Sequence, residues 1–212
     1  MQEKMKNLII LGAGGFSKSI LDTLEGGKYN LIGFIDAFKS GKHQGYKILA
    51  NSIEELKNKE EYIFFIGIGE PKVREEYFNK LKKYNLKLAN IIDKTAILSK
   101  NITLGEGVFV GKMVIVNADV VLEDNVVLNT RSLIEHGNHI GAHTNISTNT
   151  VLNGDVKVGK STFIGSCTVV NGQIKIGSNS VIGSGSVVIR DIEDSVVVVG
   201  SPTRFIRRNI NE

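Results

Sequence analysis

Aliphatic residues recur at every sixth position through the second half of the chain. Helices bury a residue about every 3.6 positions and ordinary strands every second one, so neither explains a strict period of six. The hexapeptide parallel β-helix does explain it, because three short strands form a triangular coil of about 18 residues and each strand points one residue inward. Leu98 begins the series, and fifteen positions follow it without interruption: Leu104, Val110, Val116, Leu122, Leu128, Ile134, Ile140, Ile146, Leu152, Val158, Ile164, Val170, Ile176, Ile182 and Val188.

Two further patterns support the coil. Glycine often follows the inward residue, where the chain must turn a corner. It does so at positions 105, 111, 141, 159, 165, 177 and 183. Small or β-branched residues stand two positions before the inward residue, as a narrow interior requires: Ile102, Val108, Val114, Val120, Val126, Ser132, Thr144, Thr150, Val156, Thr162 and Thr168. The pattern predicts a left-handed parallel β-helix over residues 93–212, in which Val196–Val199 leads from the last coil to Gly200–Arg204 and a polar tail.

Residues 7–92 follow a different pattern, in which apolar runs alternate with amphipathic ones. The apolar runs predict strands at Asn7–Leu11, Leu31–Ile35, Tyr62–Ile68 and Leu86–Ile92. The segments between them predict helices from the glycine turn to about Glu25, over Ser52–Lys59 and over Pro71–Tyr84. Strands alternating with helices indicate a parallel α/β sheet, so residues 1–92 are predicted to form a Rossmann-like domain.

Composition narrows the function classes. The 212 residues are 42% hydrophobic, which suffices for two modest cores, and the net charge is +4 with a pI near 9.0. No basic stripe with interleaved aromatics indicates a nucleic-acid partner. The single cysteine, Cys167, cannot form an internal disulfide, and the apolar run Leu8–Leu11 is too short for a signal peptide or a membrane span. We expect a cytoplasmic protein without a membrane span.

A glycine-rich turn follows the first strand, with Gly12, Gly14 and Gly15 at the start of the first helix. Such a turn can bring backbone amides and a helix N-terminus to a phosphate. The dinucleotide fingerprint is incomplete because Ser17 stands at its third glycine, so a purely structural turn is the alternative. Asp36 ends the second strand, where such folds place a carboxylate that contacts a ribose or sugar hydroxyl. A domain of about 85 residues holds half of a nicotinamide cradle, so a nucleotide or sugar nucleotide is the expected ligand.

Three of the four histidines lie within residues 129–146, next to Glu135 and Asn138. His136 follows the inward Ile134 by two positions, so we expect its side chain at a corner of the coil. A corner imidazole can accept a proton from a hydroxyl or amine that attacks a thioester. A solvated histidine without a catalytic part is the alternative.

A metal site is the competing interpretation of this cluster. His139 and His143 are four residues apart, and trimeric β-helices can assemble zinc sites from histidines of two subunits. However, the two histidines lie on opposite sides of a turn around Ile140, and no cysteine or carboxylate completes a closed site. We therefore expect no bound metal.

The chain resembles the NeuD sugar O-acyltransferases and, through them, the PglD-type amino-sugar acetyltransferases. The resemblance covers nearly the whole chain and includes both domains in the same order. In the first domain it rests on Gly12–Ile20, Gly33–Asp36, Phe65–Gly69 and Ile91–Leu98. In the second it rests on Asn129–Asn138, Gly154–Gly159, Gly165–Gly172, Gly183–Val188 and Gly200–Arg204.

The resemblance implies acetyl-CoA as the donor and His136 as the general base, with Glu135 as a candidate for the carboxylate beside it. CoA would lie in the groove between adjacent subunits of a homotrimer, close to Asn145, Gly154, Ser166 and Ser184. The N-terminal domain would hold the nucleotide or sugar through Gly14, Gly15, Phe16 and Asp36.

Three positions depart from the amino-sugar branch of that family. The branch has a glutamate directly after its catalytic histidine, where this chain has Gly137. It also has histidines at the positions of Asn145 and Phe16. These differences favour a hydroxyl acceptor over the amine of a nucleotide-linked amino sugar.

Three functional hypotheses follow. The first is an acetyl-CoA-dependent O-acetyltransferase that modifies sialic acid or its CMP-linked form during the synthesis of capsule or other surface polysaccharide. The second is N-acetylation of a UDP-4-amino sugar. The third belongs to another class, a non-catalytic β-helix protein that binds and supports other sialic acid biosynthetic enzymes. Release of free CoA with each acceptor separates the three.

Overall fold

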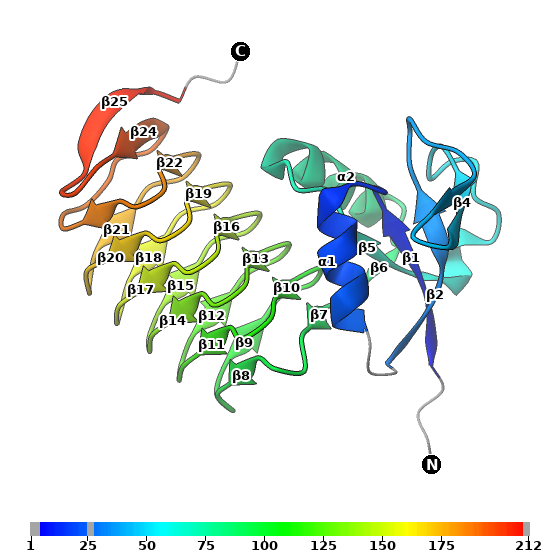
Figure 1. Ribbon diagram of the computed structural model, residues 1–212, viewed down its shortest axis with the longest axis horizontal. Coiled ribbons are helices and arrows are strands. Elements are labelled where there is room, and N and C mark those ends of the chain that lie inside the picture. The colour runs from blue at the N-terminus through cyan, green and yellow to red at the C-terminus, as the bar shows by residue number, and fades with distance from the viewer. Residues whose placement is uncertain (1–4, 25–27, 210–212) are drawn as a thin grey trace. The chain divides into compact units, whose positions relative to one another are not determined.

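The computed structural model describes residues 5–24 and 28–209. The chain divides into two compact units, Met1–Ile91 and Ile92–Glu212, one residue from the predicted boundary (Figure 1). The first unit is an α/β domain and the second a parallel β-helix, so the two predicted fold classes are confirmed.

The N-terminal unit is built on a six-stranded sheet with the order β3-β4-β2-β1-β5-β6. Its strands are β1 (Lys6–Leu11), β2 (Tyr29–Ile35), β3 (Lys42–His43), β4 (Tyr46–Ala50), β5 (Ile63–Ile66) and β6 (Lys87–Leu88). The central strand β1 pairs in parallel with β2 and β5, and its Leu8–Leu11 segment is fully buried. The continuous apolar run at the start of the chain therefore reflects a strand covered on both faces.

Two helices accompany this sheet, α1 (Gly15–Leu24) and α2 (Pro71–Lys83). α2 begins where Pro71 follows Glu70, because proline suits the first helical position and the Glu70 carboxylate accepts the N–H of Val73 at 2.7 Å. Its buried side includes Phe78 and Leu81, and three lysines lie in its last turn, where the helix dipole favours cations.

The prediction of a helix over Ser52–Lys59 is wrong. These residues form turns, followed by the short 3-10 helix η1 (Lys59–Glu61), and Asn58 has a left-handed φ of 51° that no continuing helix tolerates. The hairpin of β3 and β4 was not predicted. Its two-residue turn, Gln44–Gly45, has positive φ at both positions, which matches the twist of a tight hairpin.

The predicted strand Leu86–Ile92 is divided in the structure. β6 completes the N-terminal sheet, whereas β7 (Ile91–Ile92) is the first strand of the β-helix sheet that continues through β10. Only Ala89 and Asn90 separate the two short strands, so hydropathy alone does not mark the division.

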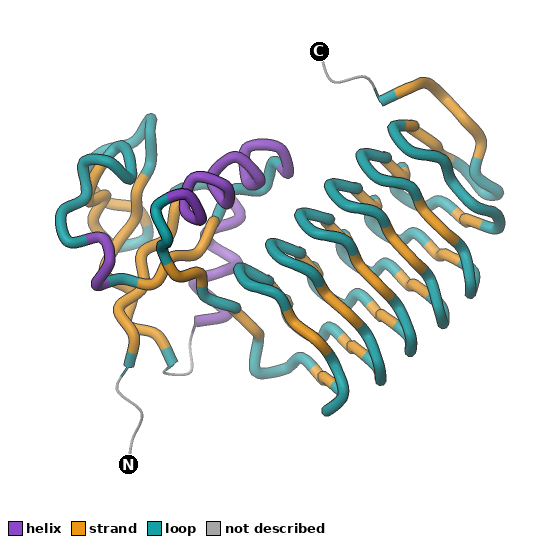
Figure 2. Tube along the Cα trace, turned by 180° about the vertical axis from the view of Figure 1, so that it is seen from behind, coloured by secondary structure: helices purple, strands orange, loops and turns teal. Residues whose placement is uncertain are grey.

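The coils of the second unit stack into three parallel sheets, and each coil contributes strands of two residues (Figure 2). Sheet C is β7, β10 (Phe109–Val110), β13 (Val127–Leu128), β16 (Asn145–Ile146), β19 (Phe163–Ile164) and β22 (Val181–Ile182). Sheet D is β8 (Ile97–Leu98), β11 (Ile115–Val116), β14 (Leu133–Ile134), β17 (Val151–Leu152), β20 (Val169–Val170) and β23 (Val187–Val188). Sheet E is β9 (Thr103–Leu104), β12 (Val121–Leu122), β15 (His139–Ile140), β18 (Lys157–Val158) and β21 (Lys175–Ile176).

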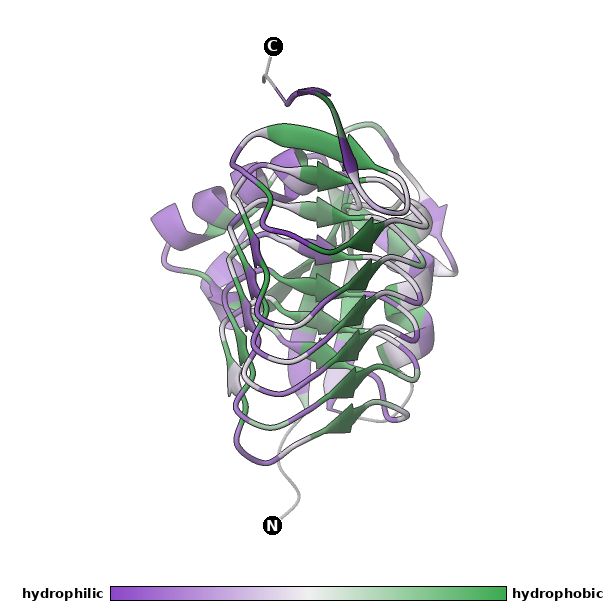
Figure 3. Ribbon diagram, turned by 90° about the vertical axis from the view of Figure 1, so that its left-hand side faces the viewer, coloured by the Kyte–Doolittle hydropathy of each residue, from purple (hydrophilic) through white to green (hydrophobic). Residues whose placement is uncertain are grey.

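The predicted sixfold series forms the interior of the coil. Partners in neighbouring strands are 18 residues apart, as in Val110↔Leu128 and Leu128↔Ile146, so the inward residues stack in columns (Figure 3). They are buried from Val110 onward, and Leu98 and Leu104 at the first coil are partly buried against the same core. Interior threonines remain satisfied because Thr144 and Thr162 donate their hydroxyls to corner carbonyls of the next coil, both at 2.8 Å.

The last coil is followed by two longer strands. β24 (Val196–Val199) continues sheet C in parallel with β22, and β25 (Arg204–Arg208) folds back antiparallel on β24. The predicted tail residues Arg204, Arg207 and Arg208 therefore lie on the outermost strand of this sheet.

Candidate functional site

The glycine turn after β1 leaves an open pocket in the N-terminal domain. A side chain on Gly14 or Gly15 would meet no atom within 4 Å, so their backbone faces open space. α1 begins at Gly15, so the N-terminus of this helix lies at the same turn. The pocket has a volume of about 390 Å³ and is lined by Gly12, Gly14, Gly15, Phe16, Ile35, Asp36, Ala37, Phe38, Gly67, Ile68, Gly69, Val73 and Tyr77.

Asp36 connects the glycine turn to the end of β2. Its Oδ2 accepts the N–H of Ala13 at 2.7 Å, and its Oδ1 accepts the N–H groups of Phe38 at 3.0 Å and Lys39 at 3.1 Å. Burial raises the pKa of Asp36, but these backbone hydrogen bonds and the Lys39 charge outweigh it, so the pKa lies below its ordinary value. The predicted sugar-binding carboxylate therefore also holds the loop that forms the pocket.

Ser17, the residue at the expected third glycine, stabilises the same turn by hydrogen bonds. Its side chain is fully buried and donates to the carbonyl of Gly14 at 2.7 Å, while His43 Nε2 lies 3.0 Å from its oxygen. Because the serine hydroxyl is already donating, it accepts from a His43 that carries its proton on Nε2. Burial, with Lys39 and Lys18 nearby, lowers the pKa of His43. The turn is thus built for a fixed shape, with its open side toward the pocket.

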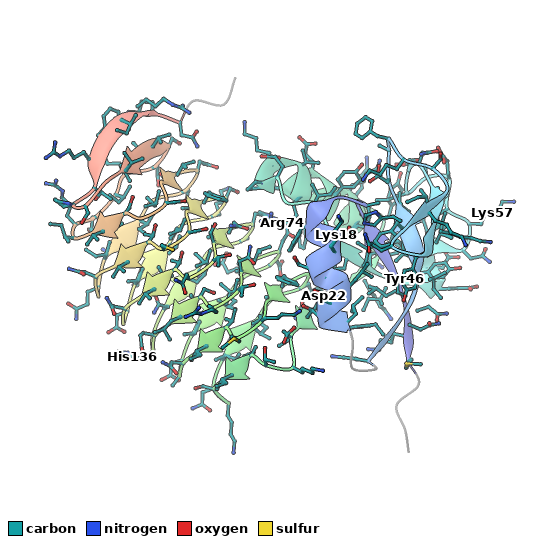
Figure 4. All side chains as sticks on the ribbon, viewed as in Figure 1. Lys18, Asp22, Tyr46, Lys57, Arg74 and His136 are labelled. Carbon is teal, nitrogen blue, oxygen red and sulfur yellow. The ribbon has the colours of Figure 1, made fainter. Side chains whose placement is uncertain are left out.

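In the β-helix, His136 lies on the corner that leads from sheet D to sheet E (Figure 4). Its side chain is 64% exposed, as predicted for a residue two positions past the inward Ile134. The imidazole lies over Gly154 of the next coil, because a Cβ on that glycine would come within 2.7 Å of His136 Nε2. Gly154, predicted to contact CoA, therefore makes room for the imidazole.

Asp155 is the carboxylate beside His136, and it was not predicted from the sequence. His136 Nδ1 lies 4.0 Å from Asp155 Oδ1, and the backbone N–H of Asp155 donates to the carbonyl of His136 at 2.9 Å. The signal that could have found it is the coil length, since Asp155 stands one coil after Gly137 on the same corner.

Glu135, the other candidate for this carboxylate, is engaged by the preceding coil. Its Oε2 accepts the side-chain amide of Asn117 at 2.8 Å, one coil earlier on the same corner. The corner itself is fixed from inside by Asn138, whose amide donates to the carbonyls of Glu135 and Asn153.

The residues predicted to contact CoA fall on two edges of the coil. Ser166 and Ser184 occupy the corner from sheet C to sheet D in successive coils, and Gly185 N–H donates to the carbonyl of Ser166 at 2.8 Å. Asn145 points toward that corner, where it donates to Ser147 Oγ at 3.1 Å. Gly154 is on the other edge, beside His136. Within one chain, these residues therefore form two separate groups, one on each edge of sheet D.

Sheet D presents an aliphatic ladder between these two edges. The residues that precede its inward positions are Ile97, Ile115, Leu133, Val151, Val169 and Val187, paired in register from strand to strand. Ile97 is exposed and the others are partly exposed. The equivalent positions of sheet E are Thr103, Val121, His139, Lys157 and Lys175. The outer face of sheet D is thus apolar where that of sheet E is largely polar. The equivalent positions of sheet C are also mostly apolar: Ile91, Phe109, Val127, Asn145, Phe163 and Val181.

The two histidines of the zinc alternative have separate partners. His139 Nε2 lies 2.7 Å from Glu123 Oε1, whereas His143 is buried with its Nδ1 2.9 Å from the side-chain amide of Asn125. Among residues 5–24 and 28–209, no group of three or more histidine, cysteine or acidic side chains could hold a metal ion. Within the same residues, the two helices are too short and too polar to cross a bilayer.

Comparison with known proteins places both units. Residues 7–81 match the family described as the PglD N-terminal domain, and residues 155–190 match the bacterial transferase hexapeptide repeat. Two solved structures resemble nearly the entire chain and belong to acetyltransferases. The two family matches, in this order, and these two structures support an acyltransferase of the PglD type.

The first of these structures is PerB from Caulobacter crescentus, solved in complex with CoA and GDP-perosamine. It is 27% identical with a TM-score of 0.87, over 95% of this chain and 97% of that one. The second is the acetyltransferase domain of PglB from Neisseria gonorrhoeae, solved in complex with acetyl coenzyme A. It is 26% identical with a TM-score of 0.91, over 95% of this chain and 100% of that one.

Proposed function

We propose that this protein is a cytoplasmic acetyl-CoA-dependent O-acetyltransferase, and that its acceptor is sialic acid or the CMP-linked form used for surface polysaccharide. The observation that carries the acetyl transfer is the exposed His136 on Gly154, at the edge of the apolar face of a hexapeptide coil. The likeness to CoA-bound sugar acetyltransferases supports the same chemistry.

His136 acts as the general base in this proposal. Neutral imidazole takes the proton of the acceptor hydroxyl at Nε2 while the hydroxyl oxygen attacks the thioester carbonyl carbon. The tetrahedral intermediate then loses the CoA sulfur, which receives the proton back from His136. The exposed position of His136 leaves its ring accessible to both substrates.

The two units divide the ligands between them. The glycine-turn pocket binds the nucleotide or sugar, because the N-terminus of α1 and the open backbone of Gly14 and Gly15 suit an anionic group. Acetyl-CoA binds the β-helix near Asn145, Gly154, Ser166 and Ser184.

A homotrimer completes the CoA site. The apolar outer face of sheet D is suited to packing against another copy, and it is bordered by the Ser166 and Ser184 edge on one side and the His136 edge on the other. Packing around a threefold axis places one edge of a subunit opposite the other edge of its neighbour. This arrangement brings together the two groups of residues that one chain keeps apart.

N-acetylation of a nucleotide-linked 4-amino sugar is the second candidate. The likeness to PerB, whose structure holds GDP-perosamine, favours it. The N-terminal match to the PglD family favours it as well. Phe16 and Asn145, where the amino-sugar branch carries histidines, favour the hydroxyl acceptor.

The test is release of free CoA by the purified protein with acetyl-CoA and a panel of acceptors. The panel contains sialic acid, CMP-sialic acid, and UDP- and GDP-linked 4-amino sugars, with His136→Ala as the control for spontaneous hydrolysis. Release with a sialic acid supports the proposal, and mass spectrometry of the product locates the acetyl group. Release with an amino sugar alone supports the second candidate. No release with any acceptor, together with binding to sialic acid biosynthetic enzymes, supports the non-catalytic alternative.

A further inference from the structure

We propose that Asp155 is the positioning carboxylate of His136, and that Gly137 is glycine because Asp155 occupies the space a side chain there would need. This inference rests on the proposed function, since it assigns a role within the same site. It concerns the state of the imidazole, which is measurable whether or not the acceptor is known.

The β-helix brings these residues together through its periodicity. Asp119, Gly137, Asp155 and Gln173 occupy equivalent positions on one corner in four successive coils, and all four have left-handed backbones with φ between 61° and 68°. Because each corner residue lies next to the one in the following coil, the side chain of Asp155 is directed at Gly137 and at the preceding residue, His136.

The space at Gly137 is filled by Asp155. A Cβ built on Gly137 would lie 2.2 Å from Asp155 Oδ1 and 3.2 Å from its Cγ. The left-handed backbone is not the reason for glycine, because Asp119 and Gln173 adopt it on the same corner. A side chain at position 137 therefore fits only if the carboxylate of Asp155 rotates away from its place beside His136.

Glu135, the acidic residue that precedes His136, has a different hydrogen-bond partner. Glu135 accepts the amide of Asn117, and this hydrogen bond fixes its carboxylate on the side of the preceding coil. Asp155 by contrast lies in the coil toward which the imidazole leans, since the ring lies over Gly154. Asp155 is thus the carboxylate that the His136 ring meets.

The chemical role follows from which nitrogen faces the carboxylate. An aspartate at Nδ1 favours the tautomer that carries its proton there, and this leaves Nε2 free as the base. When Nε2 accepts the acceptor proton, the negative charge stabilises the imidazolium. The 4.0 Å separation closes by a rotation of two exposed side chains, as is usual before substrates bind.

The first experiment changes the charge at constant shape. Asp155→Asn keeps the fold because asparagine tolerates a left-handed backbone. We expect kcat for CoA release to fall about three- to thirtyfold, between the effects of an exposed and a partly buried charged hydrogen bond, with both KM values within about twofold. The matched control is Asp119→Asn, two coils away on the same corner with the same φ of 61°. Equal kcat values for the two variants would overturn the proposal.

The second experiment moves the carboxylate to the other position. Asp155→Gly suits the left-handed backbone and clears the space at Gly137, so the pair Gly137→Glu with Asp155→Gly should fold. We expect Asp155→Gly to lose at least as much kcat as Asp155→Asn, and the pair to recover much of that loss. A folded pair no faster than Asp155→Gly would show that the carboxylate is not what matters.

The third experiment does not depend on turnover. The ring nitrogens of His136, labelled with ¹⁵N, report the tautomer by NMR, with His136→Ala used to assign the signals. We expect the Nδ1–H form to predominate in the natural chain and the Nε2–H form to gain in Asp155→Gly. An unchanged tautomer overturns the positioning role. If no acceptor releases CoA but the tautomer changes, the proposed function has failed and the positioning role stands.

Discussion

The glycine-turn pocket and the His136 corner are built in opposite ways. In the pocket, Asp36 and Ser17 engage the backbone of the turn, so the loop is held by hydrogen bonds within its own domain. At the corner, His136 is 64% exposed, and its carboxylate neighbour lies 4.0 Å away. The first site is ordered before any ligand arrives, whereas the second is placed by the repeat and left accessible.

The difference indicates how each site gains specificity. A pocket with its hydrogen bonds already satisfied recognises a ligand by shape and by the few amides it leaves open. An exposed corner gains its precision from the second substrate and from a neighbouring subunit. We therefore expect changes at the corner to lower turnover, and changes at the glycine turn to weaken acceptor binding.

The largest effect is expected from His136→Ala. Without the general base, kcat should fall about a hundredfold or more, while the fold and assembly persist because the side chain points away from the core. Steady-state release of CoA measures the effect. The control is His139→Ala, on sheet E next to Glu123, which should change kcat by less than about twofold. A fully active His136→Ala would mean that another group accepts the proton.

The second largest effect is expected from a change in the proposed trimer interface on sheet D. Val169→Glu puts a charge into the aliphatic ladder of sheet D and should weaken trimer association roughly a hundredfold, because a buried unpaired charge is costly. The KM for acetyl-CoA should rise with it, since the two edges separate. Sedimentation velocity at several concentrations measures the assembly.

Lys175→Glu, on sheet E, is the matched control for this charge. It should leave both the assembly and the KM for acetyl-CoA nearly unchanged. If Val169→Glu stays trimeric, the outer face of sheet D is not the interface.

Asp36→Asn should affect the pocket alone. Loss of the charge weakens the three hydrogen bonds that hold the turn, so we expect the KM for the sugar to rise about tenfold while that for acetyl-CoA stays nearly constant. Glu76→Gln, an exposed carboxylate on α2, is the control. If the KM for acetyl-CoA moved instead, the assignment of ligands to domains would be reversed.

Asp36→Asn should also change how the stability of the N-terminal domain depends on pH. Because the folded pKa of Asp36 is depressed, its contribution to stability is complete above the ordinary value near 4 and is lost as the pH falls below it. The acid-side loss of stability should therefore be shallower in Asp36→Asn. All five tyrosines lie in the N-terminal unit and the chain has no tryptophan, so tyrosine fluorescence during denaturation reports this domain.

Ser17→Ala should have the smallest effect. It removes the hydroxyl that links Gly14 to His43, which we expect to cost about 1 kcal/mol and to raise the KM for the sugar two- to threefold. Ser19→Ala, exposed on the same helix, is the control and should change neither quantity. An equal response of the two variants would show that the buried hydroxyl does not shape the pocket.

The β-helix was predictable because its sequence repeats the same physical requirement many times. Each inward residue from Val110 to Val188 fills an equivalent place, so irregularities at single corners do not obscure the period. The position of His136 followed directly from that register. The N-terminal domain offers no such repetition, and the turns over residues 51–58 were mistaken for a helix because their polar and apolar residues fit a helical pattern.

Partners across coils were harder to predict. Asp155 lies beside His136 only because the chain makes one full coil between them. Adjacency in the sequence instead favoured Glu135 as the carboxylate beside the imidazole. The role of Asp36 in holding the turn involves backbone N–H groups, which leave no mark in the sequence. One coil length added to Gly137, the residue after His136, reaches Asp155, whereas no such step reaches the backbone partners of Asp36.

The strand that follows the last coil has a consequence for assembly along the coil axis. A parallel β-helix that simply stops offers unpaired backbone groups to any other end of the same kind, and copies could then stack into filaments. Here β25 covers the end of sheet C, and its own outer edge carries Arg204, Arg207 and Arg208. Two such ends approaching each other bring like charges together, and this repulsion disfavours stacking in that direction.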